Sequence, residues 1–338
     1  MLAACSGDDG SGGAIVAADP SPGCSAAPAE PGRSEVLLES GDQMRRYVLY
    51  VPPGLPPGAP APLVLDVPPY SPAELEEQFS EFTRARDDGT VKADEVGAVV
   101  VTPDPIGGDG FLRTWNYTGD APGFPDDRLF FADLFADVGE RTCIDRNRIL
   151  ATGFAVGGVM AAILACDPDF GIDALATVSG PYDPPSCTRE DPLPAVAFHG
   201  TADPLLPFGG GAGPNVPLLG LTPATVAGLV GIVPDLVGAR ASARAWAEHD
   251  GCESEPESTS VGPGATRERW TSCAPGGAVD LYVIEGAGHT WPGSRGMDEL
   301  VSLLGPTTAA VAATDVLWDF FVSHVGGSSA DGSAATRP

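Results

Sequence analysis

The sequence predicts an α/β protein with a mostly parallel sheet that is covered by helices on both faces. Short apolar runs bounded by proline or glycine, such as 63–67 and 98–102, are typical of buried strands. These runs alternate with longer segments, such as 128–141, in which apolar residues recur at helical spacing. Strands that alternate with helices indicate βαβ units, which build parallel sheets.

The first half of the chain begins with two expected strands, 35–38 and 45–51, which turn at Ser40-Gly41-Asp42. A proline-rich loop follows and leads into the buried strand 63–67. The later elements expected in this half are a helix at 72–88, a strand at 98–102 and a helix at 128–141.

The second half continues the alternation. The strand 148–152 runs directly into a helix of small residues, 156–165. The remaining strands are expected at 174–179, 195–199 and 280–285, with two short strands between Cys252 and Cys273. The remaining helices are expected at 238–250 and 307–324.

The chain divides into one large domain and two flexible ends. Residues 1–23 indicate a truncated lipoprotein signal and a flexible linker rich in Gly, Ser, Asp and Ala. The domain spans 24–325, and 326–338 is expected to be a disordered tail. Within the domain, the apolar segment 209–237 is broken by prolines and glycines, so it is either a lid or substrate-facing insertion, or only packing.

The charge of the chain is strongly acidic. It carries 46 Asp and Glu residues against 18 Lys and Arg residues, for a formal net charge of −28. Such a surface repels phosphate backbones and anionic membranes, so we expect no nucleic-acid partner. The acidic excess indicates an exported protein that is kept soluble by its charge, with salt adaptation as the alternative.

Seven cysteines in a chain of this size indicate an oxidising compartment. Met1-Leu2-Ala3-Ala4-Cys5 is similar to the end of a bacterial lipoprotein signal, in which the cysteine carries lipid. Of the other six, Cys252 and Cys273 are the favoured disulfide, while the pairing of Cys24, Cys143, Cys166 and Cys187 stays open. No C-x-x-C or His-rich spacing supports a metal site, and we expect no cofactor.

The most informative stretch is Gly153-Phe154-Ala155-Val156-Gly157, which follows the strand 148–152. A strand that enters a glycine-flanked sharp turn and then a helix is the frame of the nucleophile elbow, G-x-S-x-G. In that frame a strained backbone lifts the central side chain above the sheet. Here the central residue is Ala155, so a methyl group stands where a serine hydroxyl is expected.

Two further segments supply an acid and a base in the expected chain order. Asp203 lies in the turn-rich segment H-G-T-A-D-P, and His289 lies in G-A-G-H-T-W-P-G. Each segment follows a predicted strand, where catalytic side chains are usually carried. An aspartate that accepts from one imidazole nitrogen leaves the other nitrogen facing residue 155.

These motifs resemble a known family. The segments C-I-D-R-N-R-I-L-A-T-G-F, A-F-H-G-T-A-D-P-L-L-P-F-G-G-G and G-A-G-H-T-W-P-G-S closely resemble secreted polyhydroxybutyrate-depolymerase-like and feruloyl-esterase-like α/β-hydrolases. Thr114-Trp115-Asn116 and the Trp246…Cys252…Cys273 pattern also match, so the resemblance covers roughly 35–324.

The resemblance implies an α/β-hydrolase fold and hydrolysis of carboxylic esters. It assigns the triad acid to Asp203 and the base to His289, with Trp115 and Trp291 expected to contact substrate. The nucleophile role has no matching residue, because Ala155 occupies its position.

The loop that should form the oxyanion hole is also altered. Family members usually have a His-Gly pair after the strand that corresponds to 63–67, but this sequence has Pro68-Pro69. Proline has no N–H to donate, so the candidate donors are the N–H of Val156 and a group of Tyr70. The loss of one such donor typically costs roughly 10²–10³ in rate.

The two departures favour an esterase-family pseudoenzyme that binds an ester, an aromatic acid or a polysaccharide decoration at the cell surface. The alternatives are a serine esterase represented by an inactivated variant, and an active hydrolase with a nonstandard site. Another nucleophile is not evident, because Cys166 is expected in a disulfide and Ser179 in a structural turn. Ser71, in the altered loop, remains a weaker candidate.

The lipoprotein interpretation is testable. When the gene is expressed with its true upstream start, we expect a membrane-associated protein that Cys5→Ser releases into the soluble fraction, because lipid chains on this cysteine would anchor it. Fractionation and immunoblotting measure the distribution. An upstream sequence that encodes no hydrophobic segment would contradict the interpretation.

Overall fold

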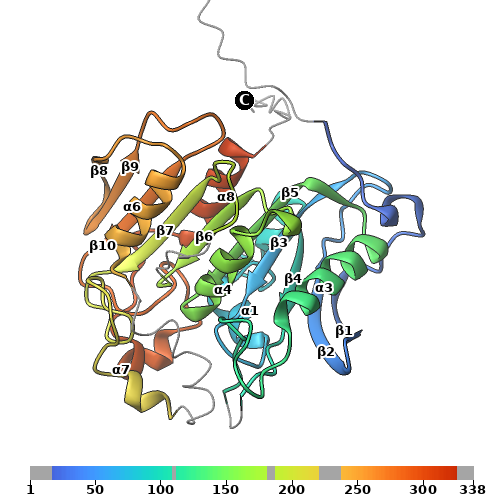
Figure 1. The fold of residues 1–338 in the computed structure, drawn as a ribbon, viewed down its shortest axis with the longest axis horizontal. Helices are drawn as coiled ribbons and strands as arrows, with labels where there is room; N and C mark the ends of the chain where they lie inside the picture. Colours follow the sequence, from blue (N-terminus) through green and yellow to red (C-terminus); the bar gives the residue numbers. More distant parts are fainter. Residues whose placement is uncertain (1–16, 109–111, 181–186, 221–236, 326–338) are drawn as a thin grey trace, which may run out of the picture.

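The computed structural model describes residues 17–108, 112–180, 187–220 and 237–325. The described residues contain a ten-stranded sheet in the order β1-β2-β4-β3-β5-β6-β7-β10-β9-β8 (Figure 1). The strands are β1 Gly32–Ser40, β2 Gln43–Val51, β3 Ala61–Val67, β4 Val99–Pro103, β5 Ile144–Phe154, β6 Ala174–Val178, β7 Ala195–Gly200, β8 Glu257–Gly262, β9 Ala265–Trp270 and β10 Val279–Ile284.

The centre of the sheet is parallel and its two edges are antiparallel. From β4 through β3, β5, β6 and β7 to β10, each neighbouring pair of strands is parallel. The pairs β1–β2, β2–β4, β9–β10 and β8–β9 are antiparallel. The carboxyl ends of the central strands therefore meet at one edge, which is where open α/β sheets place their ligand sites.

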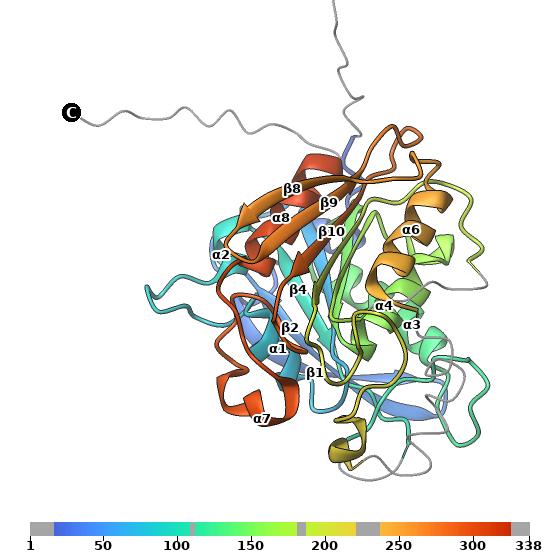
Figure 2. The same ribbon diagram turned by 90° about the vertical axis from the view of Figure 1, so that its left-hand side faces the viewer.

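Helices cover both faces of the sheet, as predicted. The helices are α1 Glu74–Ser80, α2 Lys92–Val96, α3 Asp127–Arg141, α4 Val156–Ala165, α6 Ala239–His249, α7 Val301–Leu304 and α8 Ala313–His324. One core cluster joins α3, α4 and α6 to the sheet, and a second joins α1, α2 and α8 to the opposite face (Figure 2). The predicted α/β-hydrolase architecture of a mostly parallel, helix-covered sheet is confirmed.

Two predicted helices are shorter in the structure than in the sequence analysis. The helix expected at 72–88 ends at Ser80, because Glu81 has a left-handed φ of 55° that turns the chain away. The helix expected at 307–324 begins only at Ala313. Before it, the carbonyls of Pro306 and Thr308 accept hydrogen bonds from the loop after β10, so this segment serves that loop instead. The short helix α2 was not predicted.

Three disulfides close loops in the described chain: Cys24–Cys143, Cys166–Cys187 and Cys252–Cys273. The favoured pair Cys252–Cys273 encloses β8 and β9, and the other two bonds give partners for the four cysteines whose pairing was open. Among the described residues, no cluster of His, Cys, Asp or Glu is arranged to hold a metal ion. No described helix is both long and apolar enough to cross a membrane.

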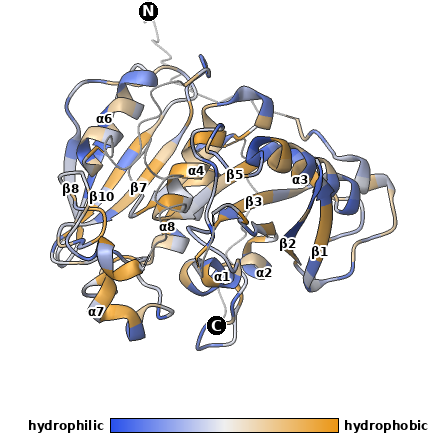
Figure 3. Ribbon diagram, turned by 60° about the horizontal axis from the view of Figure 1, so that its bottom comes forward, coloured by the Kyte–Doolittle hydropathy of each residue, from blue (hydrophilic) through white to orange (hydrophobic). Residues whose placement is uncertain are grey.

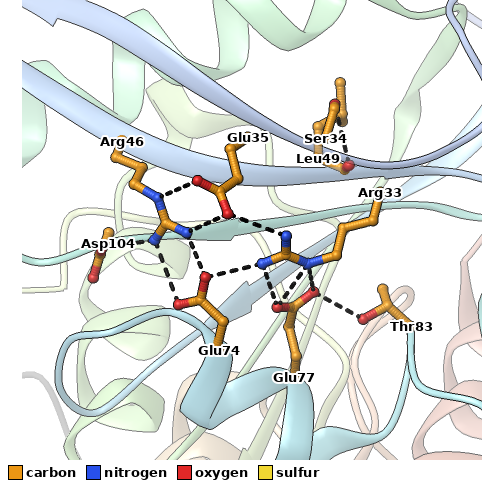
Figure 4. Close-up of polar contacts among 9 residues, drawn as sticks. All are labelled: Arg33, Ser34, Glu35, Arg46, Leu49, Glu74, Glu77, Thr83 and Asp104. Carbon is orange, nitrogen blue, oxygen red and sulfur yellow. Dashed lines mark hydrogen bonds and ion pairs between the residues drawn. The ribbon is translucent and has the colours of Figure 1, made fainter.

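The outer face of α1 is fixed by a network of ion pairs (Figure 4). Arg33 on β1 binds Glu77, with 3.0 Å between Nη2 and Oε2, and also binds Glu74. Arg46 on β2 binds Glu74 and holds Asp104 at 2.9 Å. The pairs are partly exposed, so each adds little alone, but together they fix the position of α1 against the antiparallel edge.

The inner face of α1 carries a buried pair of carboxyl groups. Glu76 and Asp66, on β3, are almost fully buried, and the two carboxyl groups interact electrostatically. Ser80 Oγ donates to Asp66 Oδ2 at 2.6 Å. Burial raises the pKa of Asp66 to about 7, and burial together with the charge of Asp66 raises the pKa of Glu76. Two ionised carboxylates in this place would repel each other, so the pair shares a proton.

The shared proton makes stability depend on pH. The pKa of Asp66 is raised in the folded state, so its stabilising contribution is complete below the unfolded value near 4 and is lost as the pH rises through about 7. We expect the free energy of unfolding to fall between pH 5 and pH 8. Asp66→Asn should reduce that fall by on the order of 2 kcal/mol, because one carboxylate is removed.

Urea unfolding across this pH range measures the effect. The matched control is Asp120→Asn, which removes the same charge at an exposed site and should leave the pH dependence unchanged. Parallel pH profiles for the wild type and Asp66→Asn would show that the pair holds no extra proton.

Candidate active-site cavity

The turn between β5 and α4 retains the backbone of a nucleophile elbow although its central residue is alanine. Ala155 has φ 50° and ψ −127°, and its N–H donates to the carbonyl of Val178 at 2.8 Å. This left-handed φ costs an L-amino acid about 1–3 kcal/mol. The side chain that the turn presents is a methyl group.

The elbow depends on two glycines whose missing side chains allow three elements to touch. A Cβ atom added at Gly157 would lie 2.1 Å from the carbonyl oxygen of Val67, at the end of β3. A Cβ atom at Gly153 would lie 2.6 Å from the carbonyl carbon of Gly157. Because neither atom is present, the loop after β3 packs directly against the first turn of α4.

The structure brings Asp203 and His289 together. Asp203 follows β7, His289 follows β10, and these strands are parallel neighbours. His289 Nδ1 lies 2.7 Å from Asp203 Oδ2. Asp203 Oδ1 accepts the backbone N–H groups of Leu205 and Leu206, each at 2.8 Å. The carboxylate is thus fully engaged, and it orients the imidazole ring.

A second histidine, His199, also contacts Asp203. Its Nε2 lies 2.8 Å from the carbonyl oxygen of Leu206 and 3.3 Å from Asp203 Oδ2. Burial by itself would raise the pKa of Asp203, but the charges and hydrogen bonds of His289 and His199 outweigh it and hold the pKa well below its usual range. An ionised Asp203 favours the tautomer of His289 that carries its proton on Nδ1.

A cavity of about 320 Å³ lies over the elbow and is almost entirely apolar. Both Ala155 and His289 line it. Its leucines are Leu75, Leu112, Leu205, Leu206, Leu219, Leu300, Leu303 and Leu304. They come from α1, from α7 and the 3-10 helix Asp298–Leu300 before it, from the 3-10 helix Val216–Leu219, and from the loops after β4 and β7. Figure 3 shows α7 as an apolar segment at this end of the molecule. A larger polar cleft of about 760 Å³, beside residues 84–88 and 292–299, contains neither Ala155 nor His289.

The loop after β3, where the sequence analysis expects the oxyanion donors, is tightly held. The carbonyl of Pro68 accepts a hydrogen bond from Trp115 Nε1 at 2.7 Å, and the carbonyl of Pro69 accepts one from Thr114 Oγ1 at 3.1 Å. Tyr70 and Val156, the two candidate oxyanion donors, both line the cavity. Burial raises the pKa of Tyr70 well above its usual range, so its hydroxyl stays protonated.

The two tryptophans expected to contact substrate do not reach the cavity. Trp115 and Trp291 are 0% and 1% exposed, and neither lines it. Trp291 Nε1 donates to Thr314 Oγ1 at 2.9 Å, which ties the loop of His289 to α8. The two rings stay out of the cavity because each indole N–H donates to a protein oxygen inside the core, and both residues thereby position loops.

Several expectations fall partly or wholly outside the described residues. Cys5 and the tail 326–338 lie outside them, as does most of the segment 209–237. The described part of that segment contributes Ala212, Val216 and Leu219 to the cavity. The leucines of α7 were not predicted as part of the site, although the run Leu300-Val301-Ser302-Leu303-Leu304 is a recognisable apolar segment in the sequence. The Asp66–Glu76 pair was not predicted either.

The chain is similar to esterases in sequence. It is 28% identical to a putative esterase from Nocardia uniformis over 82% of this chain and 79% of that protein. It is 27% identical to feruloyl esterase B of Piromyces equi over 72% of this chain, a match that spans only 42% of the relative. A third relative is feruloyl esterase D of Neurospora crassa, at 28% over 57% of this chain and 65% of the relative. No family model matches.

Among solved structures, a thermophilic esterase from Thermogutta terrifontis aligns with a TM-score of 0.50 at 16% sequence identity. The alignment covers 89% of this chain and 95% of that chain. At this identity the likeness shows the fold alone. Together with the sequence relatives, it confirms the resemblance drawn from the motifs.

The strain at Ala155 is measurable. Ala155→Gly should raise the free energy of unfolding by about 1 kcal/mol, because the relief of strain exceeds the usual penalty for glycine of about 0.5–1 kcal/mol. The matched control is Ala151→Gly on β5, the strand that leads into this turn, where the backbone is extended and the same change should destabilise. Equal destabilisation by both substitutions would mean that the turn stores no strain.

Proposed function

We propose that this chain, a feruloyl-esterase-like α/β-hydrolase, binds the apolar part of a carboxylic ester in the cavity over Ala155 and forms no acyl-enzyme there. The observation that carries the proposal is that Ala155 and His289 line the same cavity while His289 is bonded to Asp203. The ester would be a small molecule or part of a polymer.

The chemistry of a serine esterase requires a hydroxyl at the elbow. The serine oxygen attacks the ester carbonyl while histidine removes its proton, and a covalent acyl-enzyme results. A methyl group has no lone pair to attack and no proton to give. In serine proteases the loss of the serine costs roughly 10⁶ in kcat. His289 retains its base position, so the most it can do is activate a water molecule.

The oxyanion side is weakened as well. Pro68 and Pro69 have no N–H, so the negative charge of a tetrahedral intermediate would be met by the N–H of Val156 and by Tyr70. The carbonyls of both prolines point to Thr114 and Trp115. A hydrolase built on this site would therefore have to work without the serine hydroxyl and with fewer oxyanion donors.

A second candidate function is hydrolysis through a nonstandard site. It is favoured by one observation, the intact 2.7 Å contact between His289 Nδ1 and Asp203 Oδ2, which would support general-base activation of water. In this case His289→Ala abolishes activity although no residue becomes acylated.

Location and domain organisation belong to the same proposal. We propose that residues 24–325 form one hydrolase domain that acts outside the cytoplasm. The three disulfides support an oxidising compartment. Attachment through a lipid on Cys5 would place the domain at the cell surface, and the net charge of −28 argues against a nucleic-acid partner.

Restoring the missing groups tests the proposal. The wild type should show no acyl-enzyme burst with p-nitrophenyl esters and no labelling by a fluorophosphonate probe. Ala155→Ser should restore labelling, because the new hydroxyl gains a base from His289. The further changes Pro68→His and Pro69→Gly should raise kcat by an additional ~10²–10³ if an oxyanion donor is regained.

Mass spectrometry locates the label, and stopped-flow absorbance measures the burst. The control is Ala155→Ser combined with His289→Ala, in which labelling should be lost again. If the wild type hydrolyses aryl esters at rates near those of the triple variant, and His289→Ala abolishes that activity, the binding function is wrong and the second candidate holds.

A further inference from the structure

We infer that the cavity binds free monocarboxylates with an apolar aliphatic tail in preference to the corresponding esters, with the carboxylate held between His289 and the first turn of α4. The inference rests on the proposed function, because it concerns the same cavity, and it specifies the chemical class of the ligand. It departs from an esterase, for which the acid is a product that must leave.

The first observation is the free ring nitrogen of His289. The side chain is 3% exposed and lines the cavity, and its Nδ1 is used by Asp203. Within the described residues, no hydrogen bond engages its Nε2. In a serine esterase this nitrogen bonds the serine hydroxyl. Here Ala155 carries a methyl group in its place, so a nine-tenths-buried polar group that lines the cavity has no partner among the described residues.

The second observation is the start of α4. Val156 is the first residue of this ten-residue helix and lines the cavity. The first N–H groups of a helix have no acceptor within it, and they carry a partial positive charge that favours anions. A carboxylate bound at His289 would thus meet an imidazole nitrogen on one side and a backbone N–H on the other.

The third observation is the distribution of charge. The protein has a formal net charge of −28, yet none of the described residues that line the cavity is Asp or Glu. Among the ionisable groups around His289, Asp203 contacts its Nδ1, His199 contacts Asp203, and Tyr70 lines the same cavity, while Glu76 interacts with the backbone of Phe154, whose ring packs against His289. Because Asp203 engages Nδ1, a ligand carboxylate would be held at Nε2.

The residues that line the cavity indicate which kind of tail the ligand carries. Eight of the lining residues are leucines, and the polar ones are Tyr70 and His289. A volume of about 320 Å³ is at the small end of ligand cavities, which fits a chain of medium length. Each buried CH₂ group should tighten binding about three- to fourfold.

Calorimetry with the full-length protein tests the inference. The probes are butanoate, hexanoate and octanoate, with methyl octanoate as the uncharged comparison, at pH 6.0. We expect octanoate to bind at least tenfold more tightly than methyl octanoate. Titrations in two buffers of different ionisation enthalpy should show proton uptake with octanoate and none with methyl octanoate, because a carboxylate oxygen and an imidazole nitrogen can bond only through a proton between them.

A variant separates the head-group contact from the cavity. His289→Gln keeps a polar side chain without a charge, so it should abolish the preference for the acid, measured as the ratio of the affinities for octanoate and methyl octanoate in the same variant, and should also abolish the proton uptake. The matched control is His324→Gln, at the exposed end of α8, which should change neither. Circular dichroism verifies folding, and the proton-uptake measurement on the wild type decides the inference if His289→Gln does not fold.

The outcomes are distinguishable. If methyl octanoate binds but octanoate binds no tighter and takes up no proton, the inference is overturned and the proposed function stands. If neither ligand binds, both are overturned. A preference for octanoate that persists in a folded His289→Gln variant would place the carboxylate elsewhere and overturn the assignment of His289.

Discussion

The backbone contact between the end of β3 and the first turn of α4 places the loop Pro68–Tyr70 beside the elbow. It requires that Gly157 have no side chain, since a Cβ atom there would overlap the carbonyl oxygen of Val67. Because α4 begins directly after Ala155, the same close approach accompanies the strained backbone of that residue.

The sequence predicted those features whose signals are local. The glycine frame around Ala155 and the loop motifs of Asp203 and His289 are short, and strand order brings them together. The leucine walls come from α1, α7 and the Val216–Leu219 helix, segments far apart in the chain, so no local pattern shows that they meet. Asp66 and Glu76 also lie apart in the chain, so no local pattern shows that they meet. The motifs that contain the two tryptophans likewise do not indicate that both rings are buried in the core.

Several features around the cavity are energetically unfavourable. A left-handed alanine, a buried aspartate with two histidine partners and the buried Asp66–Glu76 pair all lower stability or restrict sequence. Most proteins are only slightly more stable than function requires, so such costs persist where something depends on them. A preorganised and largely apolar cavity, with no acidic residue in its described lining, is a consistent explanation.

The disulfide Cys24–Cys143 and the cavity lie at opposite ends of β5. The disulfide fixes the early chain at the amino end of β5, where Ala17 also accepts a hydrogen bond from Asn147. The cavity lies at the carboxyl end of that eleven-residue strand, roughly 35 Å away along its length. Any support that held the early chain would therefore orient the binding site outward, toward the surrounding medium, where diffusing ligands arrive unobstructed.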